Sequence, residues 1–317
     1  MLRFFKKKAK EFFREAFSSA YPELDVKSLQ AKLSQLDRYN DSLDELKILN
    51  AKNILQNWAP NDLSSAEFKV FSQWGDDGII QYLVEKIEPE FYQFVEFGVG
   101  NYREANTRFL LINNNWTGLV MDCDQKNIDQ IKHEKIYWKY DLKVRRELVT
   151  IENVNKIISN EGFKGGIGLL HIDIDGNDYW IWKSITCIEP LIVIVEYNSV
   201  FGIDRPITIP YNEKFTRDQH HSGLYLGASL LALCDLANEK GYYFIGSNSA
   251  GNNAYFVRKD KIGDLKPLSA HEGYVESKFR ESRNRKGELT YARFQERIEL
   301  IRGLEVYNTR SGKIEQI

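Results

Sequence analysis

The residues with the clearest chemical potential are three carboxylates in the segment 171–178. Asp173, Asp175 and Asp178 follow the apolar run 167–172 and flank a glycine. Burying carboxylates is costly unless they are paired or bind a cation. The alternative is a solvated turn, which would explain one or two of the three acids. We therefore predict a functional role here, with Asp173 and Asp175 as catalytic candidates.

A second polar group, Glu196 and Asn198, ends the apolar run 191–195. The ends of adjacent strands in a sheet lie roughly 5 Å apart. Asp173 or Asp175 would then join Glu196 and Asn198 in an all-oxygen site of the kind that Mg²⁺ prefers. The alternative is that Glu196 orients substrate hydroxyls or pairs with a base. Both interpretations remain open at this stage.

The segment Glu96-Phe97-Gly98-Val99-Gly100 predicts a ligand-binding turn. Gly98 and Gly100 let the backbone turn sharply and approach a ligand closely. A helix after the turn would offer free N–H groups to a carboxylate, and Glu96 would suit an ammonium group. A plain β–α turn has the same glycine pattern. Arg103 replaces the third glycine of the nicotinamide fingerprint, which disfavours the rival interpretation of an NAD-dependent oxidoreductase.

Acids also follow the next two predicted strands. Asp122 is placed to accept hydrogen bonds from a ribose diol, with Asp124 as its back-up. Asp141, after a predicted strand at 136–139, would take an adenine amino group while Leu142 covers the ring. The alternatives are a helix N-cap, which fits Asp124 better, and an exposed loop acid for Asp141.

Two adjacent histidines, His220 and His221, lie in a polar loop. An imidazole titrates near neutrality, so one of them is a candidate general base toward a substrate hydroxyl. The alternative is a surface loop without a role. The long stretch 201–222, which contains Pro206 and Pro210, predicts a loop that faces the substrate.

The elements that would position these residues are short apolar runs alternating with helical segments. This alternation predicts β-α-β units and a parallel sheet buried on both faces. Two further strands, at 242–246 and 254–258, predict an antiparallel hairpin at the end of the sheet. The expected parts are a helical N-terminal arm at 1–65, a central domain at 66–260 and a C-terminal helical cap at 261–317.

The N-terminal arm contains two distinct patterns. Residues 1–20 predict a basic amphipathic helix, suited to peripheral membrane contact or to packing against its own domain or a partner subunit. In residues 24–58, Leu29, Leu36 and Leu43 recur seven apart. This stripe predicts either a homodimer through the N-terminal helices or simple packing.

The composition of the chain argues against several classes of partner and cellular location. The 317 residues have a net charge of -2, so no global field favours nucleic acid. The sequence has no apolar run long enough to span a bilayer and no signal-peptide pattern. Three widely spaced cysteines, Cys123, Cys187 and Cys234, argue against a disulfide framework or a zinc site. We therefore expect a cytoplasmic protein.

Taken together, these motifs resemble class I S-adenosylmethionine (SAM)-dependent methyltransferases. The resemblance rests on Glu-x-Gly-x-Gly at 96–100, on Asp122 and on Asp-x-Asp-Gly at 173–176. The segments 71–78 (FSQWGDDG) and 171–176 (HIDIDG) resemble the FkbM-like branch, many of whose members methylate hydroxyls of sugars. The resemblance covers residues 68–258.

The resemblance implies a Rossmann-like, doubly wound, mostly parallel seven-stranded sheet, with SAM as cofactor. It implies these cofactor contacts: Gln73, Glu96, Gly98, Gly100, Asn106, Thr107, Asp122, Cys123, Asp141, Leu142 and Asp173. Some related sugar O-methyltransferases hold a metal through acids that match Asp175 and Glu196, but usually carry a His where this chain has Asp178. The implied activity is O-methylation of a sugar or surface-glycan precursor, with a catalytically inactive scaffold as the non-enzymatic alternative.

Overall fold

The computed structural model describes residues 26–317, in two units that divide after Trp58. The helix predicted at 1–20 lies outside the described residues. The first unit contains α2 (Val26–Gln56), a single helix of 31 residues. Leu36, Leu43 and Leu46 are each more than half exposed on α2. These leucines therefore lie on the surface of α2, and the homodimer stays a prediction.

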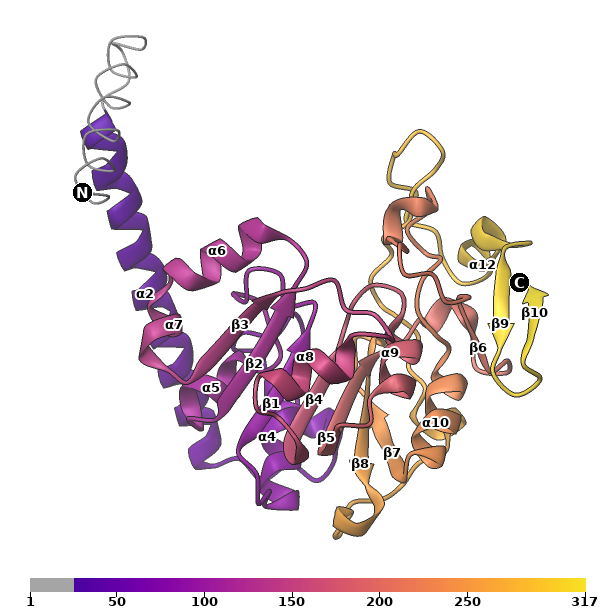
Figure 1. The fold of residues 1–317 in the computed structure, drawn as a ribbon, viewed down its shortest axis with the longest axis horizontal. Helices are drawn as coiled ribbons and strands as arrows, with labels where there is room; N and C mark the ends of the chain where they lie inside the picture. The colour runs from indigo at the N-terminus through magenta and orange to yellow at the C-terminus, as the bar shows by residue number, and fades with distance from the viewer. Residues whose placement is uncertain (1–25) are drawn as a thin grey trace. The chain divides into compact units, whose positions relative to one another are not determined.

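The second unit contains a sheet of seven strands in the order β3-β2-β1-β4-β5-β8-β7 (Figure 1). The strands β1 to β5 pair in parallel, whereas β8 is antiparallel to both β5 and β7. The predicted doubly wound, mostly parallel sheet with a terminal hairpin is therefore confirmed. The strands are β1 (Gln93–Phe97), β2 (Thr117–Asp122), β3 (Leu142–Arg146), β4 (Gly165–Ile172), β5 (Ile188–Glu196), β7 (Tyr242–Ser247) and β8 (Asn253–Arg258).

Helices cover both faces of this sheet, because alternate strand residues point to opposite sides. Val95 and Phe97 pack in one apolar core with α8, α9 and α10, whereas Glu96 points to the start of α5 on the other face. Asp76 of α4 contacts Tyr255 of β8 on that same face. The helices are α4 (Asp76–Ile87), α5 (Arg108–Asn113), α8 (Val154–Asn160), α9 (Asp178–Ser184) and α10 (Leu230–Glu239). Short helices α3 (Leu63–Ala66) and α11 (Ala270–Gly273) flank this framework.

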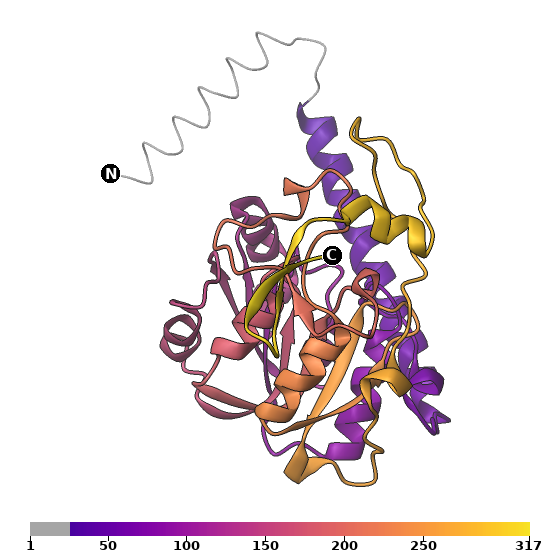
Figure 2. The same cartoon turned by 90° about the vertical axis from the view of Figure 1, so that its right-hand side faces the viewer.

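A smaller sheet, absent from the sequence-based prediction, lies beside the main one (Figure 2). Its strands are β6 (Ile207–Thr208), β9 (Glu305–Asn308) and β10 (Lys313–Gln316), all antiparallel. The predicted C-terminal helical cap contains the helix α12 (Gln295–Ile301), but its last segment forms the strands β9 and β10. Phe201, Ile301 and Val306 form part of an apolar cluster under this sheet. The loop after β5 is thereby anchored to the C-terminal segment.

The third strand also differs from the prediction. The segment expected as a strand at 136–139 is helix α7 (Lys135–Lys139), and the strand is β3, which begins at Leu142. Asp141 therefore precedes its strand: its carbonyl accepts from the Gly118 N–H, and its carboxylate accepts from the Thr117 hydroxyl. Because β2 also begins there, Asp141 and Leu142 lie at the amino edge of the sheet.

The described residues include no helix with the length and apolarity that crossing a membrane requires.

Candidate functional site

The loops after β1 and β4 meet where the strand order reverses, which is the usual ligand crevice of a doubly wound sheet. At Gly98, with φ of 73°, an added Cβ would lie 1.6 Å from the Asp173 carbonyl oxygen. At Gly100, with φ of 53°, an added Cβ would meet no atom within 4 Å. Gly98 thus lets the two loops pack closely, whereas Gly100 borders open space that a ligand can enter.

Glu96 has a structural role that the sequence did not predict. Its side chain is 2% exposed, and its carboxylate accepts from the N–H groups of Asn106 (3.1 Å) and Thr107 (3.2 Å). It also accepts from the Thr107 hydroxyl and lies 2.8 Å from His171 Nδ1. Glu96, Asn106 and Thr107 thus bond to one another, and their contact with a cofactor stays a prediction. Glu96 fixes the start of α5 beside β4.

His171 is the residue that sequence reasoning missed. It is buried near the end of β4, and its Nε2 lies 3.1 Å from the Asn106 side-chain nitrogen. Burial lowers the pKa of His171, but the hydrogen bond and negative charge of Glu96 outweigh this effect, so the pKa is raised. Its place inside an apolar run gave no signal of this contact. Glu96, His171 and Asn106 form a buried polar chain under the turns after β1 and β4.

Asp122 lies at the carboxyl end of β2, as predicted, and is half-buried. It accepts from the Gly100 N–H (2.9 Å), the Asp124 N–H (2.8 Å) and the Asn127 side chain (3.0 Å). Asp124 caps α6 (Gln125–His133), as its alternative interpretation predicted. Asp122 thus joins the glycine turn to the end of β2, and its contact with a ribose stays a prediction. Cys123, beside it, is exposed.

The adenine contact predicted for Asp141 and Leu142 was wrong, because both residues lie at the opposite edge of the sheet. The strand β3 ends at Arg146, and the residues that follow it are Glu147 and Leu148. The Glu147 N–H donates to the Asp122 carbonyl at 3.1 Å, and Leu148 is 53% exposed. Glu147 and Leu148 therefore follow β3 on the same side of the sheet as Asp122, where the sequence predicted Asp141 and Leu142.

An acidic cluster lies at the ends of β4 and β5. It consists of Asp173, Asp175 and Glu196, which bring one carboxylate oxygen each to within 4.8 Å of the others. Asp178 serves the turn instead, because it accepts from the N–H groups of Ile174 (2.8 Å) and Gly176 (2.9 Å). The predicted meeting of these strand ends is confirmed. We define this trio as the acidic cluster.

The acidic cluster favours bound protons when no cation is present. Burial is the largest of the effects that raise the pKa of Asp173 to about 7. The charge of His171 opposes this shift, whereas the charges of Asp175 and other acids add to it. Burial and the charges of Asp173 and Asp175 raise the pKa of Glu196 well above its usual value. A site of this kind accepts either a proton or a cation near neutral pH.

The long loop contacts the acidic cluster through an arginine that the sequence reading did not single out. Arg217 Nη1 lies 3.3 Å from an Asp175 oxygen, and Arg217 Nη2 lies 3.6 Å from Glu281. His220 Nδ1 pairs with the Ser222 hydroxyl at 2.8 Å, and its ring lies 4.3 Å from that of His221. Among the contacts of the described residues, none joins either imidazole to the acidic cluster. Their role as general base stays a prediction.

Asn198, the other predicted metal ligand, uses its side-chain amide within the protein, and its contact with a metal stays a prediction. Its side-chain nitrogen donates to the carbonyls of Leu224 (2.8 Å) and Leu226 (3.0 Å). Its side-chain oxygen accepts from the Val200 N–H at 3.0 Å. The amide is therefore fully used in holding the loop after β5 against the segment before α10.

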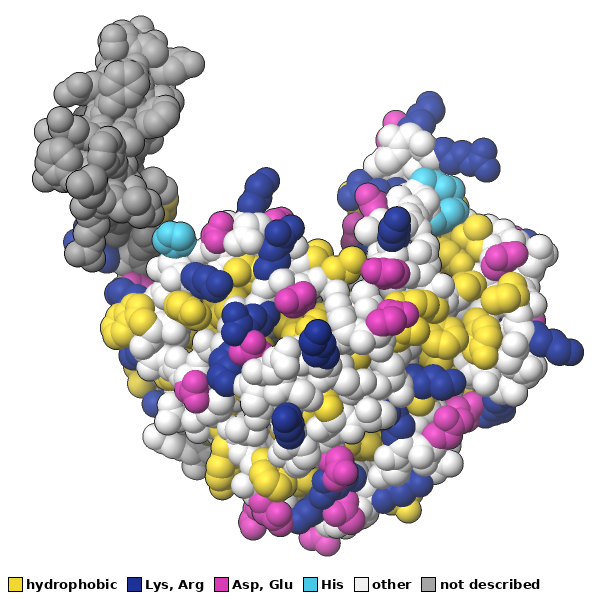
Figure 3. Space-filling view, in the orientation of Figure 1, with side chains coloured by type: hydrophobic (Ala, Val, Ile, Leu, Met, Phe, Trp, Pro, Cys, Tyr) yellow, Lys and Arg dark blue, Asp and Glu magenta, His cyan; other side chains and the backbone are white. Residues whose placement is uncertain are grey.

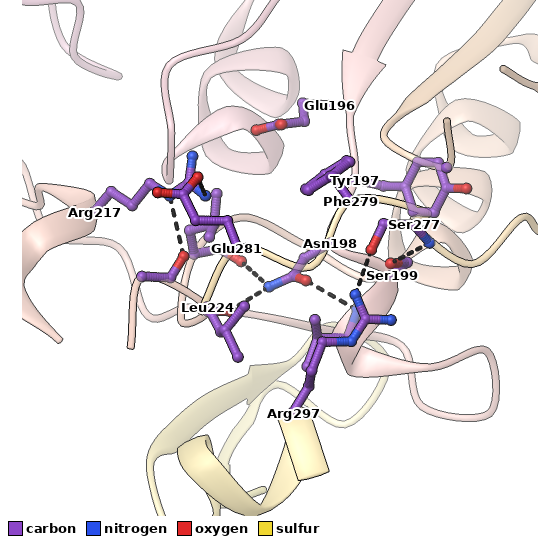
Figure 4. Close-up of a pocket in the computed structure, with 14 residues that line it drawn as sticks. Glu196, Tyr197, Asn198, Ser199, Arg217, Leu224, Ser277, Phe279, Glu281 and Arg297 are labelled. Carbon is purple, nitrogen blue, oxygen red and sulfur yellow. Dashed lines mark hydrogen bonds and ion pairs between the residues drawn. The ribbon is translucent and has the colours of Figure 1, made fainter. Parts of the chain in front are cut away.

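A narrow cavity of about 30 Å³ begins at Glu196 and reaches Arg297 (Figure 4). Its other walls include Arg217, Phe279 and Glu281. A cavity of this volume holds only a few waters at most, since one water needs about 10–15 Å³. A larger ligand would enter only if part of its lining moved.

The segment before α4 reaches the narrow cavity through an aromatic pair. The Trp74 ring stacks on Phe279, with ring centres 5.8 Å apart. The buried Asp77 carboxylate holds this segment by accepting from the N–H groups of Val70 and Ser72, at 2.8 and 2.7 Å. Gln73 is exposed on the same segment, and its contact with a cofactor stays a prediction.

Comparison with known proteins gives weak likenesses of fold only. No protein-family model matches the chain, and no curated protein matches its sequence. The chain is similar to the N-terminal domain of EvdMO1 with SAH bound, at 8% identity and a TM-score of 0.40 over 71% of this chain and 94% of that one. It is similar to an O-methyltransferase from Bacillus cereus in complex with SAH, at 14% identity and a TM-score of 0.39 over 71% and 97%. It is also similar to a SAM-dependent methyltransferase from Clostridium acetobutylicum, at 11% identity and a TM-score of 0.38 over 58% and 90%. These low identities and TM-scores indicate a similar fold and do not assign a function to the residues of the site.

Proposed function

We propose that this chain is a SAM-dependent methyltransferase that transfers a methyl group to a hydroxyl of a sugar or glycan precursor. The observation that carries the proposal is the position of Asp173. Its backbone abuts the Gly98 turn, and its carboxylate belongs to the acidic cluster. Glu196, a member of this cluster, lines the narrow cavity that reaches Arg297, which we call the acceptor pocket. A donor beside Gly100 and an acceptor beside Glu196 would meet at Asp173.

The residues of the crevice suit SAM in charge and shape. The open space beside Gly100 admits the methionine part, and Asp122 is placed to accept from a ribose diol. Leu148, exposed at the end of β3, would cover the adenine ring. When bound, SAM supplies an electrophilic methyl group on a sulfonium sulfur.

The acidic cluster supplies the base in this proposal. The acceptor oxygen attacks the methyl carbon in line, the carbon–sulfur bond breaks, and the hydroxyl proton passes to the Asp173 carboxylate. Polar side chains around the acceptor pocket, Arg217 and Glu281 among them, suit hydroxyl groups, and Phe279 gives an apolar wall for a sugar ring. These features favour a polyhydroxylated acceptor over an apolar one.

The proposal predicts that Gly100→Ala abolishes SAM binding in a protein that still folds. The new methyl group would occupy the open space. Because the backbone at position 100 is left-handed, alanine there would also lower the free energy of unfolding by about 1 kcal/mol. Calorimetric titration with SAM measures the first effect and urea unfolding the second. Gly303→Ala is the matched control, because Gly303 also has a positive φ and no neighbour within 4 Å. Wild-type protein that binds NAD but not SAM would contradict the proposal.

As an alternative to Asp173 as the base, we propose that the acidic cluster holds Mg²⁺ during turnover, with Asp173 as a ligand of the ion. The donors fit such an ion, since three carboxylates converge and only Asp175 has an arginine partner among the described residues. The ion would be held by Asp173, Asp175 and Glu196, and it would polarise the acceptor hydroxyl. The competing proposal is that these acids contact the acceptor directly.

The two proposals differ in how pH and Mg²⁺ act on stability. Without a cation, folded Asp173 keeps a proton that the unfolded chain releases, because its pKa rises from 3.8 to about 7. This group's contribution to stability is therefore lost as pH rises from about 4 to about 7. Mg²⁺ competes with the proton, so it should raise the melting temperature more at about pH 8 than at about pH 5. At a Mg²⁺ concentration of about 100 times its Kd, the free energy of unfolding should increase by about 2.7 kcal/mol.

Thermal melts with Mg²⁺, and with K⁺ at equal ionic strength, measure this effect. Glu196→Gln should remove the Mg²⁺-dependent increase, because it takes away one oxygen ligand and its charge. If wild-type protein shows no increase at about pH 8, the acidic cluster acts without the ion.

A further inference from the structure

A second cavity, of about 340 Å³, lies next to the acceptor pocket and has a strongly basic lining. Its walls include Lys278, Arg280, Arg293 and Arg297 against a single carboxylate, Glu276. The whole chain has a net charge of -2, so this concentration of positive charge is local. Ligand sites of small molecules have volumes from about 300 to 1,000 Å³, a range that includes this one. We call it the basic cavity.

Arg297 leaves one buried donor without a partner in the basic cavity. Its side chain is 4% exposed, with Nη1 2.6 Å from the Ser277 hydroxyl and Nη2 2.6 Å from Glu276. Its Nε is buried and has no hydrogen-bond partner among the described residues. Buried donors are nearly always paired, so the Arg297 guanidinium, which lines the basic cavity, retains one N–H that an acceptor or a water could satisfy.

The other three cations are available to a ligand. Lys278, Arg280 and Arg293 are exposed and line the basic cavity, and the ion pairs found among the described residues do not include them. Lys and Arg side chains also gather on the raised segment at the upper right of Figure 3. The one carboxylate of the lining, Glu276, is paired with Arg297, so an anion in the basic cavity would offset the charges of the other three cations.

The basic cavity borders the acceptor pocket at two shared residues. Ser277 and Arg297 line both cavities, and the close-up shows them pointing toward each other at the end away from Glu196 (Figure 4). A ligand that presented a hydroxyl at Glu196 could therefore place a second group among the cations. Phe294, 70% exposed in the wall of the basic cavity, offers a ring face for a planar group.

We propose that the basic cavity binds a phosphate or diphosphate group of the acceptor, so that the acceptor is a phosphorylated or nucleotide-linked sugar. Guanidinium groups bind phosphate oxygens through paired, charge-assisted hydrogen bonds, and Lys278 adds a point charge. The inference rests on the proposed function, because it assigns this anion to the acceptor of that reaction. The class of reaction that supplies the substrate would then be sugar phosphorylation or nucleotidyl transfer.

Calorimetry on the full chain tests the inference with four probes: UDP-glucose, glucose 1-phosphate, inorganic phosphate and glucose. The two phosphorylated sugars should bind at least tenfold more tightly than glucose. Added salt should lower the affinity for the phosphorylated sugars. The double variant Lys278→Ala/Arg293→Ala should lose at least tenfold in affinity for the phosphorylated sugars. Lys286→Ala is the matched control, because Lys286 is an exposed cation of the same segment outside the basic cavity.

Three results would overturn the inference. Glucose would bind as tightly as its phosphate, or the double variant would bind both phosphorylated sugars as wild type does. Alternatively, inorganic phosphate would bind as tightly as glucose 1-phosphate, which would indicate a free-anion site. A parallel titration with SAH separates the two proposals: SAH binding without sugar-phosphate binding contradicts this inference alone, whereas loss of SAH binding contradicts the proposed function.

Discussion

Replacing Asp173 by Asn is expected to slow methyl transfer by about 10²- to 10⁴-fold, the usual contribution of a positioned general base. The amide keeps the size of the side chain and the backbone contact with Gly98, so SAM affinity should stay within twofold of wild type. Steady-state rates with a methyl-acceptor sugar measure the first effect, and calorimetry with SAM measures the second. A smaller loss in rate would remove Asp173 as the base.

The pH dependence of the same reaction gives an independent measurement. The base accepts a proton only when it is deprotonated, so kcat/KM should rise with pH through an apparent pKa of about 7. This value belongs to the acidic cluster as a whole, because its carboxylates interact. Asp175→Asn is the matched comparison: it removes one neighbouring charge and should move the apparent pKa downward while activity persists. A pH profile unchanged by Asp175→Asn would show that the titrating group lies elsewhere.

Glu96→Ala is expected to destabilise the fold by at least about 3 kcal/mol, because it leaves several buried hydrogen-bonding groups unpaired. The groups are the N–H groups of Asn106 and Thr107, the Thr107 hydroxyl and the His171 imidazole. Urea unfolding followed by circular dichroism gives the free energy directly. SAM affinity should fall only as far as the folded fraction falls.

The control for Glu96→Ala is Glu90→Ala, which removes an exposed carboxylate that pairs with Lys261. This variant should unfold at the wild-type urea concentration, because exposed ion pairs contribute little. If Glu96→Ala were as stable as Glu90→Ala, the four contacts of Glu96 would be energetically unimportant. Glu96 would then be available for a ligand, as the sequence alone suggested.

The sequence predicted the sheet well where strands are buried on both faces, as with the apolar runs that became β4 and β5. It misplaced β3 because an edge strand needs few apolar residues, and only Leu142 and Val144 are buried there. The nearby run at 136–139 was more apolar and became α7. This one error moved the predicted adenine contact to the wrong edge of the sheet.

Individual side-chain partners were harder to predict than elements. A Glu-x-Gly-x-Gly motif does not reveal whether Glu96 faces the crevice or the helix packed behind it. His171 belongs to an apolar run, and only the tertiary fold brings it to Glu96 and Asn106. The acidic cluster was predictable because neighbouring parallel strands end together, whereas Arg217 reaches it from a loop whose path the sequence does not specify.

The small sheet has a consequence for the order in which the molecule folds. Its members are far apart in sequence: the hydrogen bond from the Thr309 hydroxyl to the Pro206 carbonyl joins residues separated by 103 positions. Closing so long a loop is slow, whereas β1, β2 and β4 are linked by shorter segments. Pulse-labelled hydrogen exchange should therefore show β1 and β4 protected before β6. If the proposed function holds, a nascent or refolding chain would form the crevice beside Gly98 first and would become selective for its acceptor last.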